Sequence, residues 1–119
     1  MAKEKSVIVD PEKIKWEPIK ELHELPKGTR GEAGAKLLRR DEETGATVVL
    51  AKFEKGFHAP RHTHPSDESG IVLEGKVVDE KGIDIKMGVY FFIPAGVEHG
   101  PIDAPEGCVL FIHSSGPRF

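Results

Sequence analysis

The stretch GFHAPRHTHPSDESGIVLEG, residues 56–75, carries three of the six histidines of the chain within seven residues. Side chains alternate between the two faces of a β-strand, so His62 and His64 are expected on one face, close enough to chelate one ion. Glu68 follows after a bend at Pro65, where the chain can bring the carboxylate back to the same space. These residue types in this order favour a metal site over a solvated polar loop.

A second stretch, GVYFFIPAGVEHG at residues 88–100, offers the further ligand that a tight metal site needs. A strand is expected to end at the Pro94–Gly96 turn and to deliver His99 from a neighbouring strand. His58 has the parity of His62 and His64 but precedes Pro60, so we expect it behind the ligands or at the rim of the site.

The two stretches resemble the two motifs of the cupin superfamily. The matching positions are Gly56, His62, His64, Glu68 and Gly75 in the first motif and Gly88, Pro94, Gly96 and His99 in the second. Asp103 stands where the second motif closes on asparagine, a turn position that is not a ligand. The rest of the chain, in its apolar runs and the placement of its turns, is similar to the cupin domain of ChrR-type anti-sigma factors and its free-standing relatives.

The resemblance implies that His62, His64, Glu68 and His99 bind a divalent metal in the mouth of a barrel. Three imidazoles and one carboxylate suit Fe(II), Mn(II), Ni(II), Zn(II) or Co(II) and leave one or two coordination positions open. The sequence does not distinguish among these metals, because affinity order and availability decide more than ligand type.

Short apolar runs separated by glycine-containing turns fill the chain from residue 34 onward. Such spacing predicts an all-β sandwich or barrel, and the resemblance specifies a cupin jelly roll, or double-stranded β-helix. Residues 1–30 are charged and interrupted by prolines, so we expect an N-terminal arm that packs on the barrel or on a partner subunit. The barrel domain is then residues 31–119.

The composition narrows the function classes. A formal net charge of −3 without a basic cluster argues against a nucleic-acid partner, and we expect no membrane-spanning segment and a cytoplasmic location. The single cysteine, Cys108, lies in an apolar run and is interpreted as a buried structural thiol. The absence of asparagine and glutamine, with abundant lysine and glutamate, indicates a thermophilic source.

Several further side chains are candidates for the pocket or for the surroundings of the ligands. They are His58, Phe53, Tyr90, Phe92 and His113. Tyr90 and Phe92 share one face of their strand and Phe91 takes the other, so the three cannot all face the metal. Arg61 is expected to point away from the ligands, and His23 in the arm is interpreted as structural or incidental.

The resemblance favours an enzyme similar to the non-haem iron dioxygenases, which would cleave a carbon–carbon bond in a small diketone, hydroxyketone or phenolic substrate. The alternatives are a non-catalytic domain that holds a metal or senses a small ligand, and a cupin isomerase. Beyond the metal ligands, no catalytic acid or base is assigned. Exposed strand edges and the arm lead us to expect a homodimer.

Overall fold

The computed structural model of the chain describes residues 5–21 and 25–117, so His23 lies outside the described residues. The described residues are almost entirely β-structure, with two short 3-10 helices in the arm. The elements are η1 (Pro11–Lys13), β1 (Glu17–Pro18), η2 (Ile19–Glu21), β2 (Ala33–Arg40), β3 (Thr47–Phe53), β4 (Phe57–Ala59), β5 (Glu68–Val78), β6 (Asp84–Lys86), β7 (Tyr90–Ile93), β8 (Ile102–Ala104) and β9 (Cys108–Ser114).

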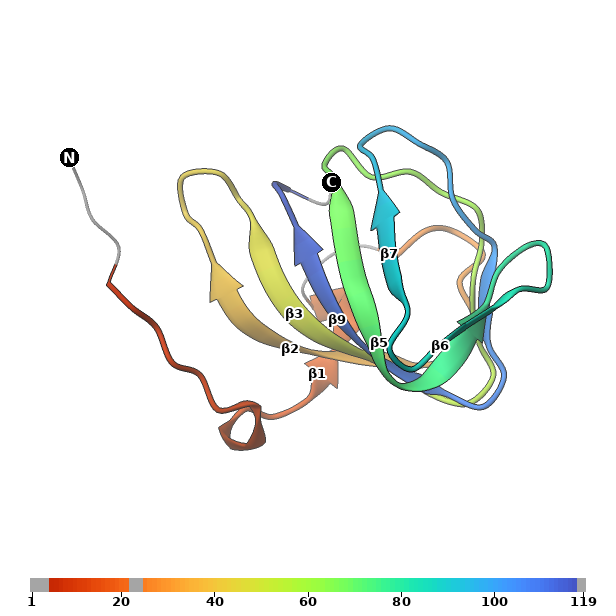
Figure 1. Cartoon of the computed structure of the whole chain (residues 1–119), viewed down its shortest axis with the longest axis horizontal. Coiled ribbons are helices and arrows are strands. Elements are labelled where there is room, and N and C mark those ends of the chain that lie inside the picture. The colour runs from red at the N-terminus through yellow and green to blue at the C-terminus, as the bar shows by residue number, and fades with distance from the viewer. Residues whose placement is uncertain (1–4, 22–24, 118–119) are drawn as a thin grey trace.

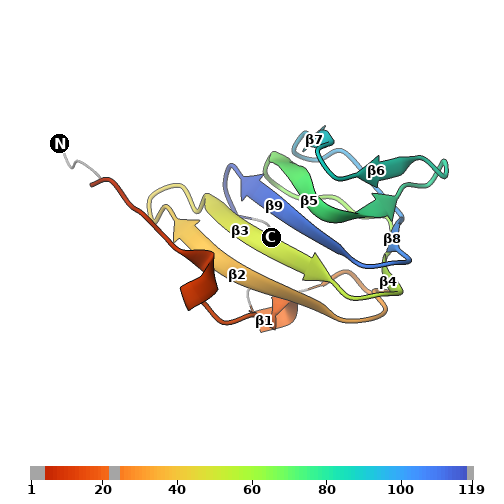
Figure 2. The same ribbon diagram turned by 60° about the horizontal axis from the view of Figure 1, so that its bottom comes forward.

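All strand pairs are antiparallel and follow the order β1-β2-β3-β9-β5-β8-β4, with β6 and β7 also paired to β5. The long strand β5 organises this arrangement, because its first half pairs with β9 and β7 and its second half with β6 and β8. A β-bulge between Val72 and Glu74 separates the two halves and bends the strand. The sheet therefore curls over itself into an open-sided barrel (Figures 1 and 2). The predicted all-β architecture is confirmed.

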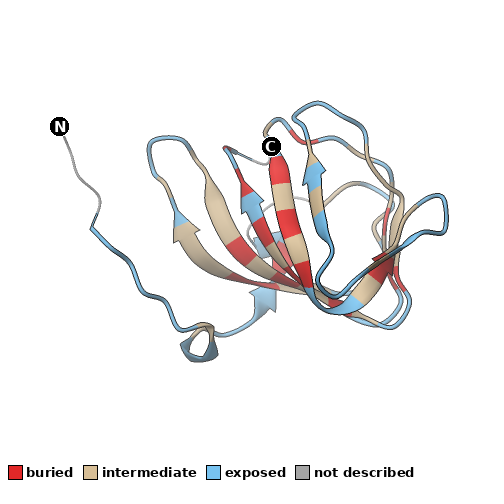
Figure 3. Cartoon of the chain, viewed as in Figure 1, coloured by how far each residue is buried: buried red, intermediate tan, exposed pale blue. Residues whose placement is uncertain are grey.

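The register assigns each residue to the inner or outer face, since opposite residues on paired strands project to the same side. One inner row is Ala35, Ala51, Leu110 and Val72, and all four are at most 5% exposed. Buried and less buried positions alternate along β5 and β9, as Figure 3 shows. The apolar core therefore lies on the concave side of the curled sheet.

The N-terminal arm contacts the barrel through a short segment only. β1 pairs with the edge strand β2, and Ile19 behind it is buried at 7% exposure. On the outer face, the ammonium group of Lys36 lies 4.7 Å from the centre of the Trp16 ring, a cation–π contact.

Residues 6–9, with the sequence SVIV, are apolar and β-branched in part but form no strand in the structure. Val7 and Ile8 are 61% and 98% exposed, and the segment leads away from the barrel (Figure 1). An isolated extended segment has no strand edge to supply hydrogen bonds, and Pro11 removes one donor immediately after it. Among the described residues, no helix has the length and hydropathy needed to cross a membrane.

Candidate metal centre

Two loops far apart in the sequence come together at one end of the barrel. His62 and His99 form an isolated antiparallel bridge, with both backbone N–H···O distances at 2.9 Å. The amide of Gly96 donates to the carbonyl of His64 at 2.8 Å. These bonds fasten the turn before His99 to the loop that carries His62 and His64, so backbone geometry fixes the spacing of the three imidazoles.

The three histidines form a compact cluster. One ligand-capable atom from each of His62, His64 and His99 lies within 4.8 Å of the others. The Nε2 atoms of His62 and His64 are 3.2 Å apart, and the rings of His62 and His99 have centroids 4.2 Å apart. Two nitrogens each bound at about 2.1 Å to a single ion would have a similar separation. The donor set therefore fits one divalent ion.

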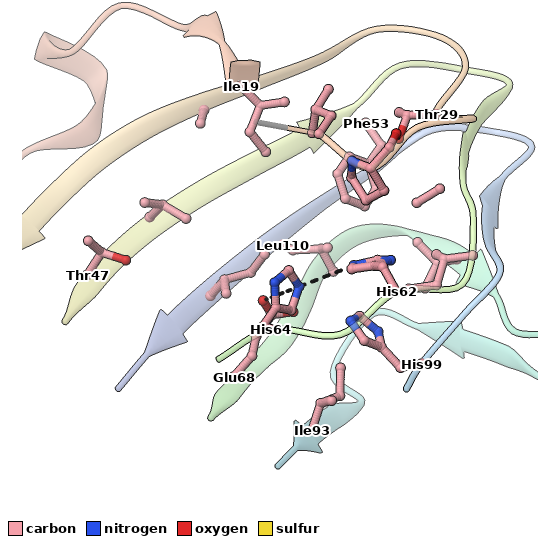
Figure 4. Close-up of a pocket in the computed structure, with 18 of the residues that line it drawn as sticks. Ile19, Thr29, Thr47, Phe53, His62, His64, Glu68, Ile93, His99 and Leu110 are labelled. Carbon is pink, nitrogen blue, oxygen red and sulfur yellow. Dashed lines mark hydrogen bonds and ion pairs between the residues drawn. The ribbon is translucent and has the colours of Figure 1, made fainter. Parts of the chain in front are cut away.

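Glu68, the first residue of β5, contacts this cluster through His64. Its Oε1 lies 3.5 Å from Nε2 of His64, and both side chains are buried. Figure 4 shows the Glu68 carboxylate beside the His64 ring. A carboxylate and three imidazoles in a buried space form a mixed nitrogen and oxygen donor set that suits first-row divalent metals.

A backbone contact orients the His62 ring. Its Nδ1 lies 2.7 Å from the carbonyl oxygen of Pro60, so Nδ1 carries the proton and donates it. In this tautomer Nε2 carries no proton, and its lone pair faces the cluster. Outer contacts of this kind fix the ring orientation of metal-binding histidines and raise their basicity.

Asp67 is a supporting residue that sequence reasoning missed. Its Oδ1 accepts from the amide of Ala95 at 2.8 Å, and its own amide donates to the hydroxyl oxygen of Ser115 at 3.0 Å. It thus connects the loop before Glu68 with the Pro94–Gly96 turn and with the end of β9. In the sequence, the only indication of this role is that Asp67 precedes Glu68, because the partners of Asp67 are distant along the chain.

His58 lies on the outer side of β4, away from the cluster. Its neighbours Phe57 and Ala59 are buried and line the inner cavity, so alternation turns His58 outward. Its Nδ1 contacts Oδ1 of Asp103 at 2.7 Å, across the β4–β8 pair. Asp103, the departure from the second motif, therefore has a cross-strand partner of its own.

The remaining pocket candidates separate by face. Phe53 lines the cavity and stacks on Phe57 with ring centroids 4.4 Å apart. Tyr90 and Phe92 lie on the outer face at 63% and 54% exposure, and His113 is exposed as well.

The inward face of β7 belongs to the residues of the other parity, Phe91 and Ile93, which line the cavity in place of Tyr90 and Phe92. Arg61 also turns away from the ligands, toward the carboxylates of Glu80 and Glu98.

The cluster opens into a cavity of about 550 Å³ within the barrel. This volume lies within the range of small-molecule sites. The wall beyond the cluster is mainly apolar and includes Val49, Phe91, Leu110 and Ile112 together with Ile19 of the arm. Figure 4 shows Ile19 and Leu110 among the side chains that line this cavity. Such a lining excludes water around any group that the cluster holds.

A curled antiparallel barrel with its histidines and a glutamate in the mouth defines a cupin. A family model, the ChrR cupin-like domain, matches residues 4–117, and the chain belongs to that family. The suspected cupin membership is thereby confirmed.

Solved structures with the same fold include enzymes. A candidate acetylacetone dioxygenase from Methylibium petroleiphilum superposes with a TM-score of 0.79 at 19% identity, covering 98% of this chain and 81% of that one. An acetylacetone dioxygenase from Acinetobacter johnsonii gives a TM-score of 0.72 at 18% identity, covering 98% of this chain and 76% of that one. At these identities the likeness concerns the fold.

One curated relative matches in sequence. It is the dimethylsulfoniopropionate lyase DddW of Ruegeria pomeroyi, 36% identical over 61 residues. The match covers 49% of this chain and 40% of the lyase, so this chain spans well under half of the relative that it matches.

Proposed function

We propose that the protein is a metal-dependent cupin in which His62, His64, His99 and Glu68 bind one divalent transition metal. The observation that carries the proposal is the convergence of three imidazole nitrogens within 4.8 Å beside a buried carboxylate. Fe, Mn, Ni, Zn and Co all suit this donor set.

We further propose that the metal-bound protein is a non-haem Fe(II)-type dioxygenase for a small diketone, hydroxyketone or phenolic substrate. When bound, the metal would polarise a chelating substrate oxygen and lower its pKa. The chain itself would contribute the fixed geometry of the donor atoms and an apolar cavity wall. The hydrogen bond from Nδ1 of His62 to the carbonyl oxygen of Pro60 would keep the His62 ring in place. In support, one neighbour in fold is described as an acetylacetone dioxygenase and another as a candidate for that activity.

The proposed reaction balances without a further reductant. A β-diketone and one O₂ molecule yield a carboxylic acid and a 2-oxoaldehyde or diketone, with one carbon–carbon bond broken. Both oxygen atoms of O₂ end up in the products. The test is oxygen uptake by the Fe(II)-loaded protein with a panel of β-diketones and hydroxyacetophenones.

The oxygen test has a control and a contrary outcome. Uptake that depends on substrate and disappears in a His62→Ala, His99→Ala variant supports the dioxygenase. A protein that keeps its metal and shows no uptake with any panel member would favour the alternative, a metal-holding domain that senses a small ligand.

A lyase is a second candidate function, supported by the match to DddW. Incubation with dimethylsulfoniopropionate, followed by detection of dimethyl sulfide without oxygen consumption, separates it from the dioxygenase. Sugar isomerisation, another alternative, would appear as neither oxygen uptake nor release of a volatile product.

We also propose that the chain forms a homodimer. The outer face of β7 presents Tyr90 and Phe92, and Leu73 of β5 is 40% exposed nearby along the same curled sheet. Exposed aromatic and aliphatic groups of this kind are typical of interaction surfaces.

A further inference from the structure

One inner row of the sheet differs from the others in polarity. The register aligns Arg40 with Thr47, Thr47 with Ser114, and Ser114 with Glu68. These four residues therefore share the inner face in one line across β2, β3, β9 and β5. The next inner row, in contrast, is Leu37, Val49, Ile112 and Gly70.

The polar row lies at one end of the cavity. Glu68 and Thr47 occupy the same end of their strands in Figure 4, and both line the cavity together with Arg40. Arg40 is exposed at the last position of β2, beside Gly45 of the following turn. At the opposite end, the Phe53–Phe57 stack contributes an apolar wall.

Arg40 is the one arginine or lysine among the described residues that line this cavity. Its guanidinium makes no hydrogen bond or ion pair with any residue that the structure describes. The adjacent Arg39 pairs in register with Val48, on the outer face, and does not line the cavity. An arginine that lines an apolar cavity and has no partner among the described residues is suited to a carboxylate, which it can hold through two parallel hydrogen bonds.

We propose that Arg40 is a specificity-determining residue that binds an anionic group at the far end of the substrate. The proposal rests on the proposed function, since the chelating end of the substrate is assigned to the cluster of His62, His64, His99 and Glu68. Three strand spacings separate Arg40 from Glu68, about 14 Å along the sheet before curvature and side-chain length shorten the gap. The substrate is then a chelating head joined by a short chain to a carboxylate tail, about 8 to 12 Å long.

The test compares two ligands that differ only at the tail, 5,7-dioxooctanoate and 2,4-octanedione. Their dissociation constants are measured by calorimetry on the metal-loaded protein under nitrogen, so that no turnover occurs. We expect the wild type to bind the carboxylate at least about tenfold more tightly, because a charge-assisted hydrogen bond is worth that much or more. Arg40→Gln should lose this preference while its affinity for the neutral dione stays the same.

Arg39→Gln is the matched control and should keep the wild-type preference. An equal preference in wild type and Arg40→Gln, or no preference in the wild type, would overturn the role of Arg40. Circular dichroism of both variants establishes that each is folded.

A third ligand, 1-octanesulfonate, separates this proposal from the proposed function. A sulfonate is a poor ligand for transition metals, so it reports on the anionic end alone. Arg40-dependent binding of the sulfonate without binding of either dione would reject the diketone class and retain Arg40. Sulfonate binding that is absent, or equal in wild type and Arg40→Gln, would reject the anion site.

Discussion

Cys108 is a residue whose chemistry is set by burial. It is 5% exposed on the inner face of β9, and desolvation raises the pKa of its thiol from 9.0 to about 11. At pH 8 the native protein should therefore react with an aromatic disulfide reagent far more slowly than the protein unfolded in guanidinium. The absorbance of the released thiolate measures both rates, and equal rates would contradict this account.

The same pKa shift predicts a pH dependence of stability. The unfolded thiol loses its proton near pH 9, whereas the folded thiol keeps it to about pH 11. The folded state thus binds more protons in this window, and stability decreases as the pH rises from 9 to 11. Denaturant unfolding of wild type and Cys108→Ala at several pH values should show the wild type losing stability relative to the variant. A constant difference between the two would contradict the prediction.

At the scale of single residues, the spacing of residues within the two motifs predicted part of the site. The two motifs led to His62, His64, Glu68 and His99 as a set. The structure groups the three histidines and places Glu68 against His64 alone, and their role as ligands stays a prediction. Alternation also separated Phe91 from its two neighbours. It could not say which parity faces inward, because β7 is aromatic on both faces.

Among the elements, β5 has the tightest steric requirement. A Cβ atom added at Gly70 would lie 2.1 Å from the carbonyl oxygen of Phe111 and 2.8 Å from the Phe91 ring. Backbone cannot yield as a flexible side chain does, so Gly70→Ala should destabilise the fold by about 2 to 3 kcal/mol. Urea unfolding measures the loss.

The matched control for Gly70→Ala is Ser69→Ala, at the preceding, half-buried position of the same strand. This change should alter the free energy of unfolding by no more than about 0.5 kcal/mol. Equal effects of the two substitutions would show that the close approach of β9 at Gly70 has no energetic consequence.

The longer strands were predictable from their apolar runs and glycine turns, and β2, β3, β5 and β9 lie close to those runs. β4 and β8 were not identified because each has only three residues, too few for a period of two to be recognised. His62 was placed on a strand with His64, yet the structure holds it in a loop through one bridge to His99. That pairing depends on a partner thirty-seven residues away and leaves no local pattern.

For the whole molecule, the exposed aromatic face predicts self-association. The wild type should have the mass of a dimer in light scattering, and replacing Tyr90 and Phe92 with lysine should shift it to the monomer. Glu43→Lys, in the β2–β3 turn, is a control of the same kind of change at a remote surface. A monomeric wild type would contradict the dimer. A dimer that persists in the double lysine variant would show that its interface lies elsewhere.

The central claim concerns the metal. Elemental analysis after metal loading and desalting should find about one divalent ion per chain in the wild type and almost none in the His62→Ala, His99→Ala variant. The control is His58→Ala, His113→Ala, which removes two histidines outside the cluster and should keep the metal. Equal metal content in the wild type and the His62→Ala, His99→Ala variant, with both folded by circular dichroism, would contradict the assignment of the site.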